Sequence, residues 1–187
     1  MTSKPGQDDD FAGSGLPIER FREDAGRLST DEFAGRHGSA FLLLSATSLK
    51  QPKSGTATEV NLLDLGDADE AGERTAGLSV QVFPIRAATD SLTHLVTVGR
   101  TSRNDLTIPD ISVSRFHAFF RRTPDDRFQL QDAGSTNGTT VRGISVCTKE
   151  AGPPTDLETG DNVRFGQIDM TFLKADALQS FVLKFDD

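Results

Sequence analysis

The chain has 187 residues, enough for one domain of ordinary size with tails. Its formal charge of −8 at pH 7 argues against a general nucleic-acid or membrane-surface role, because such roles use a basic face. Cys147 is the only cysteine, so no internal disulfide can form, and we expect a reducing, cytoplasmic environment. The sequence has no apolar run of about 18 residues, and its three histidines are scattered. We therefore expect no membrane span, no metal and no cofactor.

The N-terminal 38 residues divide into a tail and a helical segment. Residues 1–16 are polar, acidic and Gly-rich, which predicts a disordered tail without the apolar core of a secretory signal. Pro17 stands where a helix can begin. From Ile18 to Leu28 apolar residues recur at spacings of three, four and three, so we expect a helical extension over residues 17–38. This extension either covers a sheet edge or binds a partner.

The residues that follow have the sequence pattern of a β-sandwich. Residues 41–44 form an apolar run that predicts a buried strand, and residues 48–77 are a low-signal insertion with Pro and Gly breakers. Short β-branched and aromatic runs separated by turn residues then recur, which is typical of an all-β sandwich. The expected strands cover residues 78–85, 92–98, 106–108, 116–122, 127–131, 139–142, 162–165 and 168–173.

Two patterns near the end of the chain predict which side chains are buried. Phe128 and Leu130 alternate with polar residues, so both should face the core. Apolar residues from Leu178 to Phe185 follow helical spacing, which predicts a C-terminal helix over residues 176–187. Asp176 is a candidate N-cap for this helix. We read Cys147 as a small, partly buried residue.

Charge is unevenly placed along the chain. Seven arginines and five aspartates lie between His94 and Val146, a formal +2, and the rest of the chain carries −10. A locally positive surface on an acidic protein can steer an anionic ligand. An ordinary mixed strand surface has the same charge count, so charge alone leaves both interpretations open.

Three segments at predicted strand ends collect hydrogen-bond donors. They are residues 98–105, 113–118 and 134–139, and they contain Arg, Ser, Thr and Asn side chains with glycines at the turns. We find no convincing nucleophile and general base with an orienting group among them. This inventory suits binding an oxyanion rather than reacting with it, so we expect no catalytic residues.

Five motifs in this order resemble the forkhead-associated (FHA) domain. They are Gly99-Arg100, Asn104-Asp105-Leu106, Val113-Ser114-Arg115-x-His117-Ala118, Gly134-Ser135-Thr136-Asn137-Gly138-Thr139 and Leu157-x-x-Gly160-Asp161-x-Val163-x-Phe165-Gly166. The resemblance covers roughly residues 78–173. It implies an all-β fold, an FHA-type β-sandwich of two antiparallel sheets over residues 39–175, with short N- and C-terminal helical additions. It also implies that loops at one end of the sandwich bind phosphothreonine peptides.

The resemblance implies a role for each matching position. Arg100, Ser114 and Thr136 correspond to the phosphate-contacting set, with Arg115 as a second charge. Peptide contacts are implied for two positions, Arg103 and Asn137. Structural roles are implied for Gly99, Asn104, His117 and Gly138.

These residue types suit a phosphothreonine, which carries a charge of about −1.5 to −2 and three strong acceptor oxygens. Arginine supplies planar, permanently charged donors for such a group. Asparagine offers an acceptor and donors together, so it can pair with both polarities of an extended peptide backbone.

The sequence therefore predicts an adaptor that binds a phosphothreonine-containing protein or a Ser/Thr kinase, with no nucleic acid and no membrane as partners. Three alternatives stay open. A structural assembly subunit would use the same fold without phosphate, through the apolar faces of its terminal helices. A hydrolase would use Ser114 and His117. Self-association would follow phosphorylation of a threonine in a weakly patterned segment: Thr2, Thr30, Thr56, Thr58 or Thr75.

Overall fold

The computed structural model describes residues 15–45, 80–86 and 95–185 of the chain. The tail predicted over residues 1–16, apart from its last two residues, lies outside the described residues. The insertion predicted over residues 48–77 lies entirely outside them.

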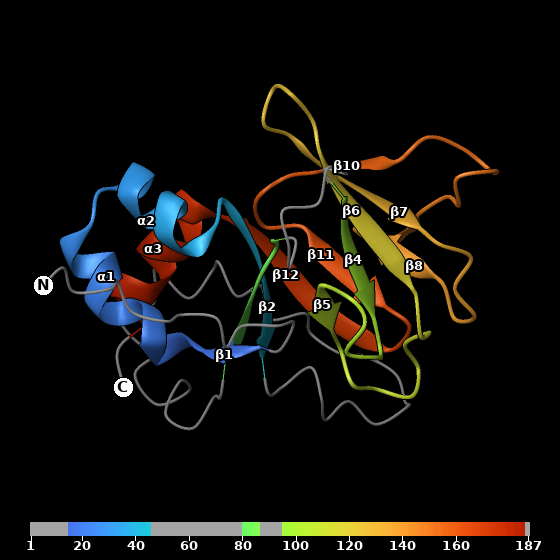
Figure 1. Cartoon of the computed structure of the whole chain (residues 1–187), viewed down its shortest axis with the longest axis horizontal. Coiled ribbons are helices and arrows are strands. Elements are labelled where there is room, and N and C mark those ends of the chain that lie inside the picture. The colour runs from blue at the N-terminus through green and yellow to red at the C-terminus, as the bar shows by residue number, and fades with distance from the viewer. Residues whose placement is uncertain (1–14, 46–79, 87–94, 186–187) are drawn as a thin grey trace, which may run out of the picture.

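Two β-sheets pack face to face (Figure 1). In spatial order, the seven-stranded sheet contains β1 (Leu16–Pro17), β3 (Val80–Pro84), β2 (Ala40–Ser45), β12 (Ile168–Lys174), β11 (Asn162–Phe165), β8 (Thr139–Val141) and β9 (Ile144–Ser145). The five-stranded sheet contains β10 (Thr155–Leu157), β7 (Phe128–Asp132), β6 (Ala118–Arg122), β4 (Leu95–Gly99) and β5 (Leu106–Thr107). The β4–β5 pair is parallel, whereas the other strand pairs within the two sheets are antiparallel. The predicted β-sandwich is thus confirmed.

The space between the sheets is filled by large apolar side chains. Phe120 and Leu130 from the smaller sheet and Phe165 and Phe172 from the larger one are fully buried in a single cluster. Phe128 is also buried there, which confirms the alternation predicted for β7. This packing gives the loops at the strand ends a rigid support.

β2 is covered on both of its faces, which explains its unbroken apolar run. Leu42 and Leu44 belong to the cluster between the sheets. Phe41 and Leu43 belong to a second cluster, formed with residues of the helices. A strand buried on both faces reads as a continuous hydrophobic run because neither side meets water.

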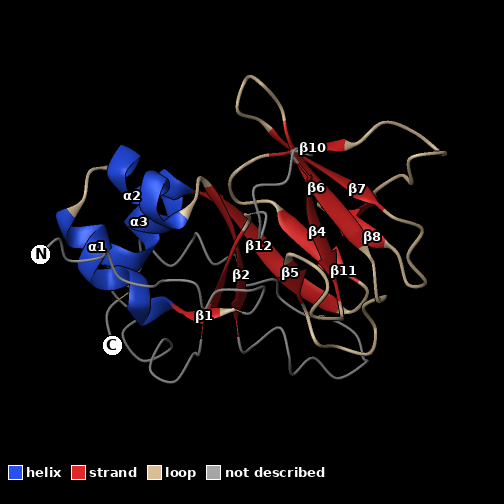
Figure 2. Cartoon of the chain, in the orientation of Figure 1, coloured by secondary structure: helices blue, strands red, loops and turns tan. Residues whose placement is uncertain are grey.

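Three α-helices and a short 3₁₀ helix form the layer over that outer face (Figure 2). They are η1 (Ile18–Phe21), α1 (Arg22–Arg27), α2 (Thr30–His37) and α3 (Ala175–Lys184). The apolar spacing predicted one N-terminal helical face, but the chain turns after Leu28. There Ser29 accepts a hydrogen bond from the backbone of Glu32, whose side chain accepts one from Ser29 N, and this capping box starts α2.

The start of α3 differs from the prediction. Its N-cap is Lys174, the last residue of β12, and Asp176 lies within the first turn. The backbone N–H of Ala175 donates to the Ser39 carbonyl at 3.1 Å, so the chain passes from strand to helix without a separate side-chain cap. A negative charge at Asp176 still complements the positive end of the helix dipole.

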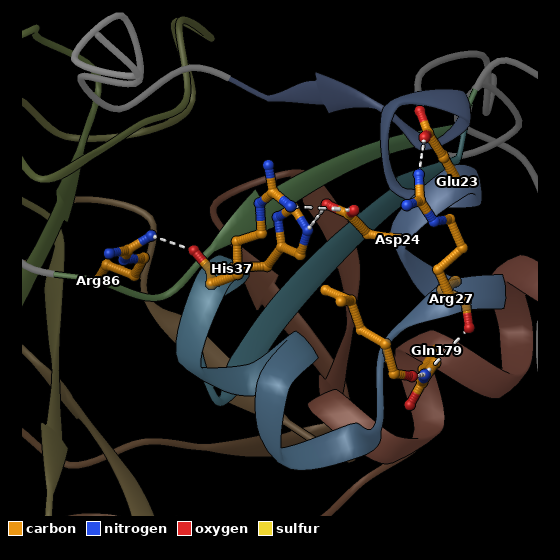
Figure 3. Close-up of polar contacts among 9 residues, drawn as sticks. Glu23, Asp24, Arg27, His37, Arg86 and Gln179 are labelled. Atoms are coloured by element: carbon orange, nitrogen blue, oxygen red, sulfur yellow. Dashed lines mark hydrogen bonds and ion pairs between the residues drawn. The ribbon is translucent and has the colours of Figure 1, made fainter. Parts of the chain in front are cut away.

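Side chains connect the three helices to one another. Gln179 of α3 donates to the carbonyl oxygens of Ala25 and Leu28 at 3.0 and 2.8 Å, and it accepts from the Thr30 hydroxyl at 2.9 Å. Asp24 of α1 lies 2.8 Å from Nε2 of His37 in α2 (Figure 3). None of the helices in the described ranges is long and apolar enough to cross a membrane.

Cys147 is exposed, contrary to the expectation of partial burial. The preceding residue, Val146, takes the inward position and is 7% exposed. Alternation along an extended segment then turns the Cys147 side chain outward.

Candidate phosphopeptide site

Three loops of the sandwich meet at the positions predicted to hold phosphate. Arg100 follows β4, Ser114 lies between β5 and β6, and Thr136 lies between β7 and β8. The Arg100 backbone N–H donates to the Ser114 carbonyl at 2.9 Å, and the Thr136 backbone N–H donates to Ser114 Oγ at 3.0 Å. The two hydroxyl oxygens of Ser114 and Thr136 lie 3.4 Å apart. The structure therefore brings these three residues together around Ser114.

The arginines of this region differ from the others in how they are paired. The described residues include thirteen arginines, and ten of them have an interaction partner. In the described ranges, the guanidinium groups of the other three form no hydrogen bond or ion pair; these are Arg100, Arg103 and Arg115. All three are exposed. Positive charge without an internal partner is thus concentrated on the loops that surround Ser114.

Asn104 holds the arginine-bearing loops together. It is buried, and its Nδ2 donates to the carbonyl oxygens of Thr101 and Arg115, both at 2.8 Å. Gly99 allows this close approach, because a Cβ atom there would lie 2.3 Å from the Arg115 carbonyl oxygen. Any side chain at Gly99 would therefore push the two loops apart.

His117 is fully buried beneath the loops, and both of its ring nitrogens are engaged. Nδ1 accepts from the Ser114 backbone N–H at 2.9 Å, so Nε2 carries the proton and donates to the Gly138 carbonyl at 3.1 Å. Gly138 itself has a φ of 78°, which favours glycine. Neither nitrogen is left to deprotonate the Ser114 hydroxyl, so the geometry gives the Ser114–His117 hydrolase alternative no support.

Burial makes His117 a source of pH-dependent stability. Burial lowers the pKa of His117 below its usual 6.5, and the Gly138 hydrogen bond and Asp132 oppose this shift only partly. Because the folded pKa is the lower one, the unfolded chain takes up a proton first as the pH falls. The contribution is fully present above about pH 6.5 and is lost at lower pH, by at most about 1.4 kcal/mol per pH unit.

We therefore expect the free energy of unfolding to fall between pH 7.5 and pH 5, and His117→Gln to reduce this fall. Urea denaturation of both proteins at the two pH values measures the difference. An identical pH dependence in the two proteins would rule out His117 as the titrating group.

Asn137 is exposed, and one end of its amide is held in place. Its Nδ2 donates to the Ser112 carbonyl at 2.7 Å. The Ser112 hydroxyl donates to Asp110 at 2.6 Å and accepts from the Gln167 backbone N–H at 3.0 Å. Sequence reasoning missed Ser112, although Asp110-x-Ser112 is a spacing at which an Asp side chain closes a turn.

Asp132 is a second residue that sequence reasoning missed. Its carboxylate accepts from the backbone N–H groups of Gly134 and Ser135 and from the hydroxyls of Ser135 and Thr139, at 2.6–2.8 Å. Burial raises the pKa of Asp132, but these hydrogen bonds outweigh burial and lower the pKa below its usual 3.8. The carboxylate therefore stays charged and anchors the loop that carries Thr136 and Asn137.

The FHA domain family matches residues 96–166. This range includes the three loops that carry Arg100, Ser114 and Thr136. The chain carries an FHA domain. The match extends from β4 to the end of β11, so it contains every residue described above as meeting around Ser114. The N-terminal helices, β2, β3 and α3 lie outside the matched residues of the FHA domain.

Several proteins resemble this FHA-containing chain. An oxoglutarate dehydrogenase inhibitor of Corynebacterium diphtheriae is 37% identical over 78 residues, which are 42% of this chain and 50% of that protein. The glycogen accumulation regulator GarA of Mycobacterium tuberculosis is 34% identical over 79 residues, 42% of this chain and 44% of GarA. The chain thus spans half or less of the length of these relatives.

A solved FHA structure aligns over a larger share of the chain. The FHA domain of the CT664 protein from Chlamydia trachomatis is 20% identical, with a TM-score of 0.43. The alignment covers 72% of this chain and 97% of that domain.

Proposed function

We propose that this protein is a non-catalytic adaptor that binds a phosphothreonine segment of a partner protein, downstream of a Ser/Thr kinase and in the cytoplasm. The observation that carries the proposal is the set of unpaired arginines around Ser114 and Thr136. Ten of the thirteen arginines in the described ranges have an interaction partner, so the three exposed arginines without one mark a surface on which an anion can bind.

Each residue then has a role that its geometry permits. Arg100 neutralises the phosphate together with Arg115, and the hydroxyls of Ser114 and Thr136 donate to its oxygens. Ser114 Oγ accepts from the Thr136 backbone, and its own O–H makes only a long contact of 3.4 Å with the Thr136 hydroxyl, so this O–H can turn toward a ligand. The Asn137 carbonyl oxygen, opposite the tethered Nδ2, accepts from the peptide backbone.

The names of two relatives support a regulatory role. One is called an inhibitor of oxoglutarate dehydrogenase and the other a regulator of glycogen accumulation. Both names describe control of another activity. We extend to this chain only that general role, the control of another activity.

Titration of phosphopeptides tests the proposal. The protein should bind a phosphothreonine peptide, bind its unphosphorylated form far more weakly, and distinguish it from the phosphoserine form. An array of phosphothreonine peptides with these two controls, read by fluorescence polarisation, gives both class and specificity. Equal binding of phosphorylated and unphosphorylated peptides would contradict the proposal.

The assembly-subunit alternative loses the surface on which it depended. It placed the interface on the apolar faces of the terminal helices. In the structure Ile18, Phe21, Leu178 and Val182 on those faces are buried in the cluster against the seven-stranded sheet. These side chains stabilise the fold of the chain itself and are not free to bind another protein.

Self-association through a phosphorylated threonine remains a narrower form of the proposal. Thr30, one of the candidate threonines, is the first residue of α2, and its hydroxyl donates to Gln179. Binding of phosphorylated Thr30 as an extended segment would require the first turn of α2 to unwind. The other four candidates lie outside the described residues. Light scattering of the kinase-treated protein should detect any change in mass.

A further inference from the structure

The rim of the proposed site carries more positive charge than one phosphate neutralises. Arg100, Arg103 and Arg115 contribute a formal +3, whereas a phosphothreonine carries about −1.5 to −2 near neutral pH. We infer that the bound peptide carries a second anionic group close to its phosphothreonine, and that Arg103 binds this group. This inference rests on the proposed function.

The loop geometry separates Arg103 from the phosphate-binding set. The Arg100 backbone is joined to Ser114, whose hydroxyl faces Thr136. Arg103 lies at the other end of the same turn, beside Asn104, which ties that end to the Arg115 carbonyl. The Arg115 carbonyl is therefore bonded to the Asn104 end of the turn, and Arg103 is the arginine of this turn nearest to that end in the sequence.

The carboxylates nearest to Arg103 in sequence are already used by the fold. Asp105 accepts from the backbone N–H and the hydroxyl of Thr97 at 2.8 and 2.7 Å. Asp110 accepts from the backbone N–H and the hydroxyl of Ser112 at 2.8 and 2.6 Å. Among the described residues, none of these carboxylates forms an ion pair with Arg103. In the described ranges, the charge of Arg103 is therefore left for a ligand to neutralise.

The hairpin between β6 and β7 shows the contrasting arrangement in the same sheet. Arg122 pairs with Asp126, and Arg127 pairs with Asp125 and Asp156 at 2.6 and 3.2 Å. Both exposed arginines of this hairpin are thus matched by the protein's own carboxylates. The unmatched charge at Arg103 is a local property of the site and not a general feature of the surface.

An Asp or Glu side chain and a second phosphorylated residue both supply the required anion. We expect the exposed Arg103 to contribute about as much as other solvated ion pairs, which corresponds to a two- to five-fold gain in affinity. A second phosphate carries more charge than a carboxylate and should give a larger gain than an acid at the same position. Added salt should reduce both gains, because exposed pairs are screened.

A peptide series on the full chain tests this inference. The parent is a phosphothreonine peptide with alanine and glycine flanks. Derivatives carry one Asp, or one phosphoserine, at each neighbouring position on either side. With the wild-type protein, at least one Asp derivative should bind about two- to five-fold tighter than the parent. Arg103→Gln should remove that gain, measured as the ratio of the affinities of the derivative and the parent peptide for the same variant.

The matched control is Arg121→Gln, an exposed arginine of the same sheet that bonds Gln129 at 2.9 Å. It should retain the preference of the wild type. A wild-type protein with no acid preference, or a preference that survives Arg103→Gln, would overturn the inference and leave phosphothreonine binding intact. A parent peptide that binds equally well without its phosphate would instead overturn the proposed function, so the two failures are distinguishable.

Discussion

Replacing Arg100 by alanine should weaken binding of a phosphothreonine peptide by roughly 10- to 150-fold. This range corresponds to the loss of a hydrogen bond to a charged group, about 1.5–3 kcal/mol. Arg100 follows β4 directly, and its backbone is fixed on Ser114, so the loop keeps its shape when the side chain is removed. Isothermal titration of the wild type and the variant measures the difference.

Thermal stability should change little in this variant. The Arg100 side chain is exposed and forms no hydrogen bond or ion pair with the residues that the structure describes. Surface substitutions of this kind usually stay within about 0.5 kcal/mol. Arg121→Ala, on the same sheet but away from the loops, controls for a general loss of positive charge. Equal affinity of wild type and Arg100→Ala would remove Arg100 from the site.

The strands of the sandwich were predictable where burial imposes a simple pattern. Phe128 and Leu130 alternate with polar residues because one face of β7 is buried, and β2 is apolar throughout because both of its faces are. The strand predicted at residues 162–165 coincides with β11. Each of these segments is long enough for its pattern of apolar and polar residues to be recognised in the sequence.

The missed elements are short or depend on partners far along the chain. β9 has two exposed residues, and it forms because Arg142 and Gly143 adopt positive φ values of 52° and 75° in a tight hairpin. β10 has three residues and pairs with β7, from which β8 and β9 separate it in the sequence. Propensity gives no signal for such strands, because tertiary pairing decides them.

The donors of the site were predictable from motifs, whereas the residues that hold them were harder to find. Arg100, Ser114 and Thr136 stand in recognisable strand-end clusters, and the structure brings their backbones and hydroxyls together. Ser112 and Asp132 act through hydrogen bonds to residues of other loops or to backbone groups. A sequence states which residues can donate, but the pairing of a buried carboxylate depends on three-dimensional proximity.

Asp132 is the position at which a single substitution should affect both folding and binding. Asp132→Ala removes the acceptor of four hydrogen bonds and leaves the Thr139 hydroxyl, on a residue only 1% exposed, without its partner. An unsatisfied buried polar group costs about 1–3 kcal/mol, and two loop N–H groups lose their acceptor as well. We expect a destabilisation of about 3 kcal/mol, or roughly 6–12 °C in melting temperature for a chain of this size.

Asp132→Asn removes the negative charge of this residue but keeps a side chain of the same shape, so it separates the effects of the two on stability. The amide oxygen still accepts from Gly134 N and Ser135 N, and the Thr139 hydroxyl can rotate to accept from the new N–H₂ group. The variant should therefore lose less stability than Asp132→Ala. Because the folded pKa of Asp132 is lowered, its contribution is present above about pH 3.8 and is lost as the pH falls below that value.

Calorimetry of the three proteins at neutral and acidic pH, with phosphopeptide titration at neutral pH, tests this ordering. Wild type should be more stable than Asp132→Asn, and Asp132→Asn more stable than Asp132→Ala, with the gap between wild type and Asp132→Asn closing in acid. Affinity should follow the same order, because the loop from Gly134 to Thr139 carries Thr136 and Asn137 and is tied to the sheet through this carboxylate. An Asp132→Ala protein that melts and binds like the wild type would show that the loop is held by its backbone contacts alone, namely the bonds from Ala133 N to His117 O and from Gly166 N to Gly138 O.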